Sequence, residues 1–390
     1  MKINEEKIKE ILERGVTEVI DKEHLKAALK SGKKLRVKLG IDPTAPDLHL
    51  GHAVLLRKLR QFQNAGHQIL LIIGDFTARI GDPSGREDAR KTLSEREIKN
   101  NFKKYLISAG KIINIKKSKI YHNSQWYKQD GVAKLLKLLG AGSIQQAIRR
   151  EDFQKRLKNG DDVTLLEAFY SLLQGYDSVA VKADVELGGA DQKLNILAGR
   201  RIQRHFGMPE QDIVILPLLE GTDGVRKMSK SFGNYISLDE KPDNIFGKIM
   251  SLPDNLLEKY FLLSTDIPAE ETKKFLNRPF EAKKTLACEI VKLYHGENAA
   301  KKAREYFEKT FSKKEIPENL KIYRAKINAE WASFLVREKL ALSRSEAKRL
   351  IENGGLDFNG RKIARASEQI SESGTVKIGK HKFIKIDVRV

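Results

Sequence analysis

Cysteine is almost absent from this chain of 390 residues, which contains one, Cys288. No intrachain disulfide can form, so we expect a protein of the cytoplasm. Long hydrophobic runs are also absent, and without about 18 consecutive apolar residues we expect no transmembrane helix and no membrane partner. Residues 1–30 are highly charged and lack the apolar centre of a signal peptide. The length and composition indicate a soluble globular protein of two or three domains.

Acidic residues are outnumbered by basic ones, 52 against 73, which leaves a formal net charge of +21. The excess is concentrated in two stretches. Residues 97–158 carry 15 Lys or Arg against 4 Asp or Glu, and residues 331–390 carry 13 against 7. A uniformly lysine-rich composition, as in many thermophiles, would also produce a basic protein. Concentrated positive charge instead favours a polyanionic partner such as nucleic acid.

Two short apolar runs, residues 35–41 and 69–74, flank a helical pattern over residues 52–65 that ends at Gly66. This order predicts a strand–helix–strand unit within a parallel sheet that is covered on both faces. In such sheets, ligands bind beyond the carboxyl ends of the strands. Asp42 follows the first strand directly, so we expect the functional site at this edge.

The segment Leu48–His52 opens the helix between those strands. His49 and His52 are three residues apart and point to the same side, at a helix N-terminus whose free N–H groups suit a phosphate. A second signal is Lys227-Met228-Ser229-Lys230-Ser231, which follows an apolar strand at residues 213–216. Two lysines three residues apart, next to small hydroxyl groups, can neutralise a polyphosphate. The two segments together predict a site for phosphates.

A third signal is a helical pattern over residues 164–177. Tyr170, Gln174 and Asp177 are spaced at i, i+4 and i+7 and form one stripe, while the other positions are mostly apolar. Because apolar residues nearly encircle the helix, we expect the polar stripe to face a cavity rather than water.

The rest of the chain reads mainly as helical. We expect helix over residues 1–31, a helical insertion at 87–163, strand patterns again from 179 to 187, and helix from 241 to 327. Residues 315–326 read as a linker, and the tail from 331 to 390 reads as a small α+β module. The expected domains are residues 1–235, with the insertion inside them, then 236–325 and 330–390.

A His-x-Gly-His motif at the first strand–helix turn, with Lys-Met-Ser-Lys-Ser after the last strand, resembles the class I aminoacyl-tRNA synthetases. The stripe on the helix at 164–177 makes the chain similar to the tyrosyl-tRNA synthetases of bacterial type. This resemblance implies a Rossmann-like catalytic domain that activates tyrosine with ATP and Mg²⁺ and charges tRNA. It also implies a homodimer formed through the insertion, an anticodon-arm-binding helical domain, and a tail like an RNA-binding module of a ribosomal protein.

The resemblance also implies residue roles. Four residues would be catalytic: His49, His52, Lys227 and Lys230. The residues expected at ATP are Thr44, Gly51, Arg86, Arg90, Gly189, Asp191, Ser229 and Ser231. The residues expected at tyrosine are Gly40, Asp42, Thr77, Asp82, Tyr170, Gln174, Asp177 and Gln192. The residues expected at RNA are Arg344, Lys348 and Arg349. No dedicated set of metal ligands is expected.

One position departs from the family pattern. Lys38, in the first strand, stands where some members carry a tyrosine that contacts the phenol hydroxyl of the substrate. Recognition of that hydroxyl would then depend more on Asp177. The alternatives are a tryptophanyl-tRNA synthetase, a nucleotidyltransferase that shares the His-x-Gly-His motif, and a non-catalytic RNA-binding homologue.

Overall fold

The structure is a computed structural model that describes residues 3–44, 46–82, 94–129, 131–312, 320–379 and 382–389. The backbone divides into two compact units, residues 1–297 and 298–390. The described helices include none with the length and low polarity needed to cross a bilayer.

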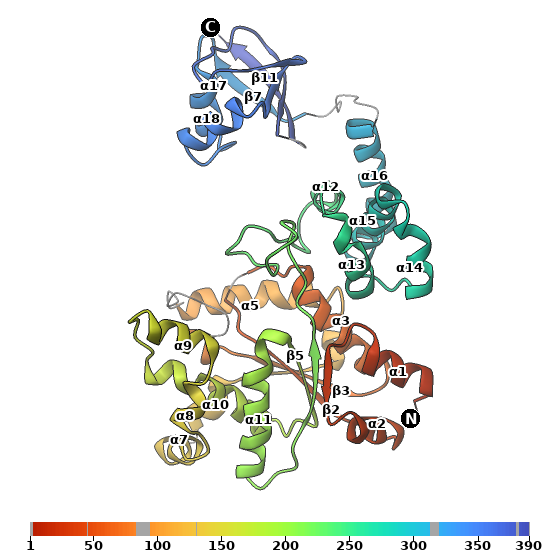
Figure 1. Ribbon diagram of the computed structural model, residues 1–390, viewed down its shortest axis with the longest axis vertical. Coiled ribbons are helices and arrows are strands. Elements are labelled where there is room, and N and C mark those ends of the chain that lie inside the picture. Colours follow the sequence, from red (N-terminus) through yellow and green to blue (C-terminus); the bar gives the residue numbers. More distant parts are fainter. Residues whose placement is uncertain are drawn as a thin grey trace. The chain divides into compact units, whose positions relative to one another are not determined.

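The larger unit is built on a six-stranded sheet in the order β1-β6-β5-β2-β3-β4 (Figure 1). The strands are β1 (Glu18–Ile20), β2 (Arg36–Ile41), β3 (Gln68–Ile73), β4 (Lys119–His122), β5 (Val185–Gly189) and β6 (Asp212–Leu216). The β1–β6 pair is antiparallel and the other pairs are parallel. The strand order reverses between β2 and β5, and a crevice is expected at such a point beyond the carboxyl ends. This confirms the predicted Rossmann-like sheet.

Helices cover both faces of this sheet, which explains why its central strands are apolar throughout. Figure 1 shows α1 and α3 on one side of the sheet and α10 and α11 on the other. These helices are α1 (Glu5–Glu13), α2 (Lys22–Lys30), α3 (Leu50–Asn64), α10 (Leu165–Ala180) and α11 (Lys193–His205). Thr164 caps α10: its hydroxyl accepts from Glu167 N, and the Glu167 carboxylate accepts from Thr164 N.

The segment between β3 and α10 is largely helical, as predicted. Its helices are α4 (Thr77–Ile80), α5 (Glu95–Ala109), η1 (Ile115–Lys117), α6 (Ser124–Gln129), α7 (Gly131–Leu139), α8 (Ile144–Ala147) and α9 (Glu151–Lys158). It also contains β4, which pairs with β3 and which the sequence reading missed. The sequence Lys-Ile-Tyr-His is short and half polar, as an edge strand can be.

Two other readings of this unit were wrong. Residues 1–31 are not helical throughout, because β1 lies between α1 and α2 and pairs with β6. The strand pattern expected from residue 179 is also wrong, since α10 continues to Ala180 and β5 begins at Val185. Here the packing of α10 against α11 outweighs the β preference of valine.

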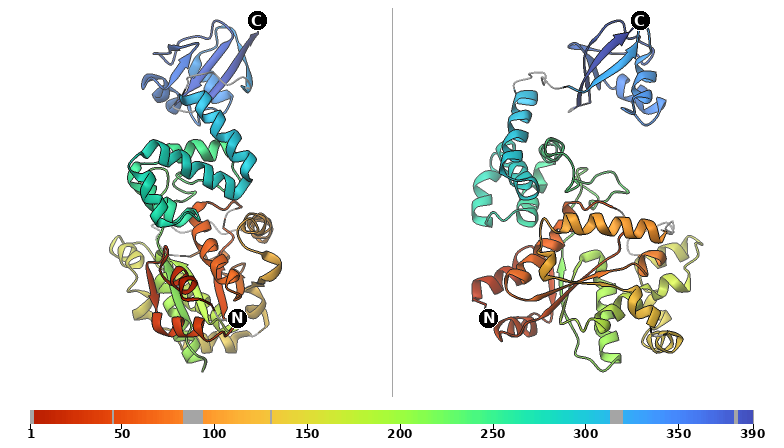
Figure 2. Two further views of the ribbon diagram at one scale, coloured as in Figure 1. Left: turned by 90° about the vertical axis from the view of Figure 1, so that its right-hand side faces the viewer. Right: turned by 180° about the vertical axis from the view of Figure 1, so that it is seen from behind.

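The helical pattern expected over residues 241–327 is confirmed as far as Ser312 and is wrong at residues 322–326, which form a strand. Its first helices are α12 (Pro242–Met250), η3 (Asp254–Leu256), α13 (Leu257–Ser264), α14 (Ala269–Leu276) and α15 (Pro279–His295). α12 and α15 each begin with a proline at the first helical position, where no N–H is needed. Figure 2 shows these helices packed together, with α13 also in contact with α3.

The smaller unit contains a five-stranded sheet in the order β7-β11-β10-β8-β9. Its elements are α16 (Glu297–Phe307), η4 (Glu308–Ser312), β7 (Ile322–Lys326), α17 (Trp331–Arg337), α18 (Arg344–Glu352), β8 (Leu356–Phe358), β9 (Arg361–Lys362), β10 (Gly374–Ile378) and β11 (Lys382–Arg389). The predicted α+β tail is confirmed. The prediction of a linker was wrong for residues 322–326, which form β7. This polar strand is stabilised by pairing with β11.

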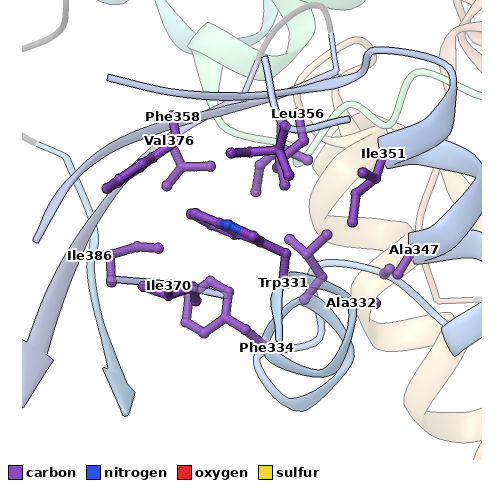
Figure 3. Close-up of a cluster of buried hydrophobic side chains, with 14 of the residues drawn as sticks. Trp331, Ala332, Phe334, Ala347, Ile351, Leu356, Phe358, Ile370, Val376 and Ile386 are labelled. Carbon is purple, nitrogen blue, oxygen red and sulfur yellow. The ribbon is translucent and has the colours of Figure 1, made fainter. Parts of the chain in front are cut away.

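Trp331 is at the centre of the core of this smaller unit (Figure 3). It is buried against Phe334 and Phe358, with ring centroids 6.1 and 5.2 Å from its own. Ala347 and Ile351 contribute the buried face of α18 to the same cluster. The opposite face of α18 is therefore left for solvent or a partner.

We predict that Ile351→Ala lowers the free energy of unfolding of the smaller unit by about 2–5 kcal/mol, because it leaves a cavity in this core. Urea titration in a Trp126→Phe background, followed by Trp331 fluorescence, measures that unit selectively, since the chain has two tryptophans. Lys348→Ala on the exposed face of α18 is the control and should change stability by less than about 0.5 kcal/mol. Equal midpoints for the two variants would contradict this packing.

Candidate active site

The turn from β2 into α3 places two histidines at the carboxyl edge of the sheet. The rings of His49 and His52 lie 3.9 Å apart between centroids, and His49 N donates to His52 Nδ1 at 3.3 Å. Burial lowers the pKa of His49 to about 2 and that of His52 to about 4, with a further contribution from the positive charge of Lys230. Both rings are therefore neutral near pH 7.

The loop that carries Lys227–Ser231 lies against this turn. Backbone hydrogen bonds join Leu50 N to Ile236 O (3.1 Å) and Leu238 N to Leu48 O (2.9 Å). The side chain of Met228 is buried in the loop. The two predicted phosphate-binding segments, residues 48–52 and 227–231, are thus neighbours in space although they are far apart along the chain.

Each lysine of that loop has an acidic partner. Lys227 Nζ donates to Asp191 Oδ2 at 2.8 Å, and Lys230 Nζ donates to Asp47 Oδ2 at 3.3 Å. Asp191 lies in η2 (Ala190–Gln192), directly after β5. The loop, the end of β5 and the β2–α3 turn therefore meet, as the predicted ATP site requires. Ser229 N donates to Asn234 Oδ1 (2.8 Å), which fixes the centre of the loop.

A hydrogen-bonded chain of side chains begins at Asp42. Its carboxylate accepts from Tyr170 Oη (2.9 Å) and from Thr77 Oγ1 (2.8 Å), and Thr77 Oγ1 accepts from Asn123 Nδ2 (3.0 Å). Gly74 is required beside it, since a Cβ there would lie 1.9 Å from Asp42 Oδ1. Three predicted tyrosine-site residues, Asp42, Thr77 and Tyr170, are thus brought together.

Asp177 closes the buried end of the same network. Its two carboxylate oxygens accept from Trp126 Nε1 (3.1 Å) and Asn123 Nδ2 (3.5 Å). Burial raises the pKa of Asp177 to about 7, against the positive charge of Lys38 and these two hydrogen bonds, which lower it. The carboxylate therefore titrates near neutral pH, where it can accept a hydrogen bond from a polar group of a ligand.

The structure also describes other residues that were predicted for the tyrosine and ATP sites. Gln192 Nε2 donates to Asp82 Oδ2 at 2.6 Å, and Gln174 is half-buried on α10. A Cβ on Gly40 would meet open space, whereas on Gly188 it would lie 2.1 Å from Ile196 Cδ1. Gly188 is thus required for packing against α11. Arg86 and Arg90 lie outside the described residues.

Trp126 and Asn123 were missed by the sequence reading. They follow β4 directly, so the rule that ligands bind beyond strand ends would have found them had β4 been recognised. Lys38 was singled out as a position near the tyrosine substrate, but its side chain is not part of the hydrogen-bonded network between Asp42 and Asp177. It is fully buried and forms an ion pair with Glu186 at 2.9 Å. Asp47 was also missed, and only its contact with Lys230 reveals it.

The predicted RNA-binding residues lie on α18 of the smaller unit. Arg344, Lys348 and Arg349 are exposed on this helix, while Ala347 and Ile351 face the core. Arg344 donates to Glu330 at 2.9 Å. A helix with a basic outer face and an apolar inner face is suited to contact with a phosphate backbone.

Comparison with known proteins identifies the family. Residues 29–312 match the family model described as tRNA synthetases class I (W and Y), and residues 332–376 match the S4 domain. The tyrosine–tRNA ligase of Aquifex aeolicus is 48% identical over 96% of this chain and 97% of that protein. The tyrosine–tRNA ligase of Thermotoga maritima is 44% identical over 98% and 97%.

Solved structures show the same fold. A C-terminally truncated mitochondrial tyrosyl-tRNA synthetase of Aspergillus nidulans matches with a TM-score of 0.66 at 22% identity, over 78% of this chain and 94% of that one. The tyrosyl-tRNA synthetase of Archaeoglobus fulgidus, solved with L-tyrosine, matches with a TM-score of 0.62 at 21% identity, over 77% and 99%. With the full-length relatives, these findings show that the chain belongs to the class I tRNA synthetases, among the tyrosyl-tRNA synthetases of bacterial type.

Proposed function

We propose that the protein is a tyrosine–tRNA ligase. It condenses tyrosine with ATP to tyrosyl-adenylate and pyrophosphate, and then transfers the tyrosyl group to the 3′-terminal adenosine of tRNA. The observation that carries this function is the buried Asp177, which lies on one hydrogen-bonded network with Asp42 at the edge where the two phosphate-binding segments meet. The likeness to full-length tyrosine–tRNA ligases favours tyrosine over tryptophan as the substrate.

Tyrosine is proposed to lie along α10 with its phenol hydroxyl on Asp177. Phenylalanine would place an apolar ring edge against that buried carboxylate and supply no hydrogen bond in place of the phenol hydroxyl, which is costly. For tyrosyl-tRNA synthetases, a known example of this effect, discrimination against phenylalanine is about 10⁵ without editing. The ammonium group is proposed to meet the acidic and polar end of the same network. The proposed tyrosine-binding residues are Gly40, Asp42, Thr77, Asp82, Tyr170, Gln174, Asp177 and Gln192.

The activation step needs no protein nucleophile. The tyrosine carboxylate attacks the α-phosphorus of ATP, the bond to the bridging oxygen breaks, and pyrophosphate leaves with that electron pair. Catalysis then consists of positioning and of stabilising the charge on the phosphates. His49 and His52 are proposed to donate hydrogen bonds as neutral rings. Lys227 and Lys230 are proposed to exchange their acidic partners for the β- and γ-phosphates, and the freed Asp191 would bind a ribose hydroxyl.

Other residues complete the proposed ATP site. Thr44, Gly51, Gly189, Ser229 and Ser231 line it, and Arg86 and Arg90 are proposed to approach the phosphates from the segment outside the described residues. Mg²⁺ is proposed to accompany ATP. Within the described ranges, the possible metal-ligating cluster is Asp21, His24 and Asp212, and Asp212 begins β6, at the amino end of that strand. The phosphates and water are thus the fitting ligands for Mg²⁺, which would neutralise phosphate charge.

The assembly is proposed to be a cytoplasmic homodimer. Large apolar side chains are exposed on the segment between β3 and α10 and on the start of α10, where a second copy would cover them. They include Val132, Leu135, Leu136, Ile144, Leu165 and Leu166. The domain boundaries that we propose, at about residues 235 and 330, are those implied by the resemblance to the tyrosyl-tRNA synthetases. Residues 236–325 are proposed to contact the anticodon arm, and Arg344, Lys348 and Arg349 the tRNA backbone.

We predict that Lys230→Ala lowers the rate of ATP–pyrophosphate exchange about 10²–10³-fold, because the lysine stabilises charge in the transition state. Tyrosine affinity, measured by fluorescence titration, should stay within about twofold, since Lys230 is absent from the Asp42–Asp177 network. Lys273→Ala, on the exposed surface of α14, is the control. A loss of tyrosine affinity as large as the loss of rate would contradict the role of Lys230.

We predict that kcat/KM for tyrosine depends on the ionisation of Asp177, whose pKa is raised to about 7. The ionised carboxylate is the form that binds the phenol, so activity is full above this pKa and falls about tenfold per pH unit below it. Exchange assays from pH 5.5 to 8.5 measure this, with KM for ATP as the internal control. A flat profile for tyrosine would show that Asp177 does not control binding.

We predict that deleting residues 320–390 leaves ATP–pyrophosphate exchange within about twofold and lowers kcat/KM for tRNA charging at least tenfold, since contacts to the RNA backbone carry much of the affinity. The deletion begins before β7, because that strand belongs to the sheet of the smaller unit. Arg344→Ala/Lys348→Ala/Arg349→Ala in the full chain tests the basic face alone. Loss of exchange in a folded truncation would refute the separation of roles.

A further inference from the structure

Lys38 is a fully buried lysine that none of the proposed roles uses. It lies in the middle of β2, and its side chain is 0% exposed. Its Nζ donates to Ser178 Oγ at 2.7 Å and to the backbone oxygen of Gln174 at 3.2 Å, and it lies 2.9 Å from Glu186 Oε1. All three donor positions of the ammonium group are therefore occupied.

Glu186 is the matching buried anion. It lies on β5 directly opposite Lys38 in the parallel register, and it is 1% exposed. Its Oε2 accepts from Ser178 Oγ at 3.0 Å and from Gln211 Nε2. Ser178 thus accepts from Lys38 and donates to Glu186, so the pair is completely hydrogen-bonded between the sheet and α10.

Stability alone does not account for such a pair. Removing two charges from water costs several kcal/mol per ion, and a well-packed apolar pair of similar volume is often equally stable or more so. The location suggests another reason. The two α10 groups that Lys38 contacts, the carbonyl of Gln174 and the hydroxyl of Ser178, lie on either side of Asp177 within one helical turn.

The charge of Lys38 also acts on Asp177. Burial raises the pKa of Asp177, the positive charge of Lys38 is the largest influence that lowers it, and the negative charge of Glu186 raises it. From α6 and the turn before it, Trp126 and Asn123 face Asp177 as neutral donors.

The phenols near Asp177 do not titrate in the same range. Tyr127 on α6 and Tyr170 on α10 have pKa values well above the ordinary value, chiefly because both are buried. Tyr170 also donates to Asp42, so the carboxylate of Asp42 is hydrogen-bonded on the far side of the network. Lys38 and Glu186 are therefore the charged side chains that act on Asp177 from the sheet, with opposite signs.

We propose that Lys38, paired with Glu186, is a positioning residue for tyrosine recognition: from beneath α10 it keeps the Asp177 carboxylate ionised and fixes the helical turn that carries Gln174 and Asp177. The proposal rests on the proposed function, because it assigns to this pair the selectivity of that site for a phenol hydroxyl. Loss of the Lys38 charge would protonate Asp177 at neutral pH and weaken the preference for tyrosine over phenylalanine.

The experiment compares the full-length protein with two variants in ATP–pyrophosphate exchange from pH 5.5 to 8.5. Lys38→Met/Glu186→Gln removes both charges without leaving one unpaired. Because Lys38 outweighs Glu186, the apparent pKa for tyrosine should rise by about one unit. Its kcat/KM at pH 7 should fall about five- to tenfold and recover to within about twofold at pH 8.5. KM for ATP should not change.

Glu186→Gln alone supplies a test of opposite sign. It keeps the Lys38 charge and removes the group that raises the pKa of Asp177, so the apparent pKa for tyrosine should fall. This variant also decides the matter if the double variant does not fold. Opposite shifts in the two variants, with a lower ratio of tyrosine to phenylalanine activity in the double variant, are the expected result.

Lys58→Met is the matched control. Lys58 is also buried, but its ammonium group donates to the backbone oxygens of Glu10, Ile11 and Arg14 at the end of α1. Its loss should lower the melting temperature and leave the pH profile unchanged. Folded Lys38 and Glu186 variants with the wild-type profile and selectivity would overturn the proposal. Failure of the proposed function itself would be visible separately, as wild-type protein that shows no tyrosine-dependent exchange.

Discussion

Two backbone hydrogen bonds, Leu50 N to Ile236 O and Leu238 N to Leu48 O, hold the two phosphate-binding segments together. One segment opens α3 and the other lies in the loop after β6. Neither segment could form the complete proposed ATP site alone. These bonds are made at the base of the loop, where its chain leaves the site at Ile236 and Leu238. Lys227 and Lys230 lie earlier in the same loop. The base can therefore stay fixed during the proposed exchange, in which the lysines leave Asp191 and Asp47 for phosphates. In the proposed mechanism, adenylate formation depends on the contact between the two segments, because both would stabilise the charge on the phosphates at once.

Burial determines the chemistry of the groups on either side of that contact. It lowers the pKa values of His49 and His52, so both rings are neutral near pH 7. It raises the pKa of Asp177, so that carboxylate requires partners to remain charged. Trp126 and Asn123 supply hydrogen bonds, and Lys38 supplies positive charge from the sheet. The same desolvation thus produces the neutral rings that we propose as donors to the phosphates and the carboxylate that we propose as the acceptor for the phenol.

Much of this arrangement could be predicted from sequence, and the failures have physical reasons. The strand–helix–strand unit around α3 and the polar stripe on α10 are strongly periodic, so their type and approximate bounds were correct. β1, β4 and β7 were missed because they are short and partly polar, and each is stabilised by pairing with a strand remote in sequence. Missing β4 concealed Trp126 and Asn123, although they follow the same rule as Asp42.

Local sequence was enough to identify the two motifs proposed to bind phosphate, the polar stripe on α10 and the family, because these depend on residue identity at short spacings. The partner that each charged side chain faces is instead set by the folded arrangement of strands and helices. Lys38 reads as a substitution in a substrate pocket, yet it points beneath α10 and pairs with Glu186, 148 positions further along the chain. A buried charge can bind substrate, or it can support another residue that binds substrate. Which of these it does depends on the strands that lie side by side in the sheet. Strand order is a long-range property that local sequence patterns do not contain.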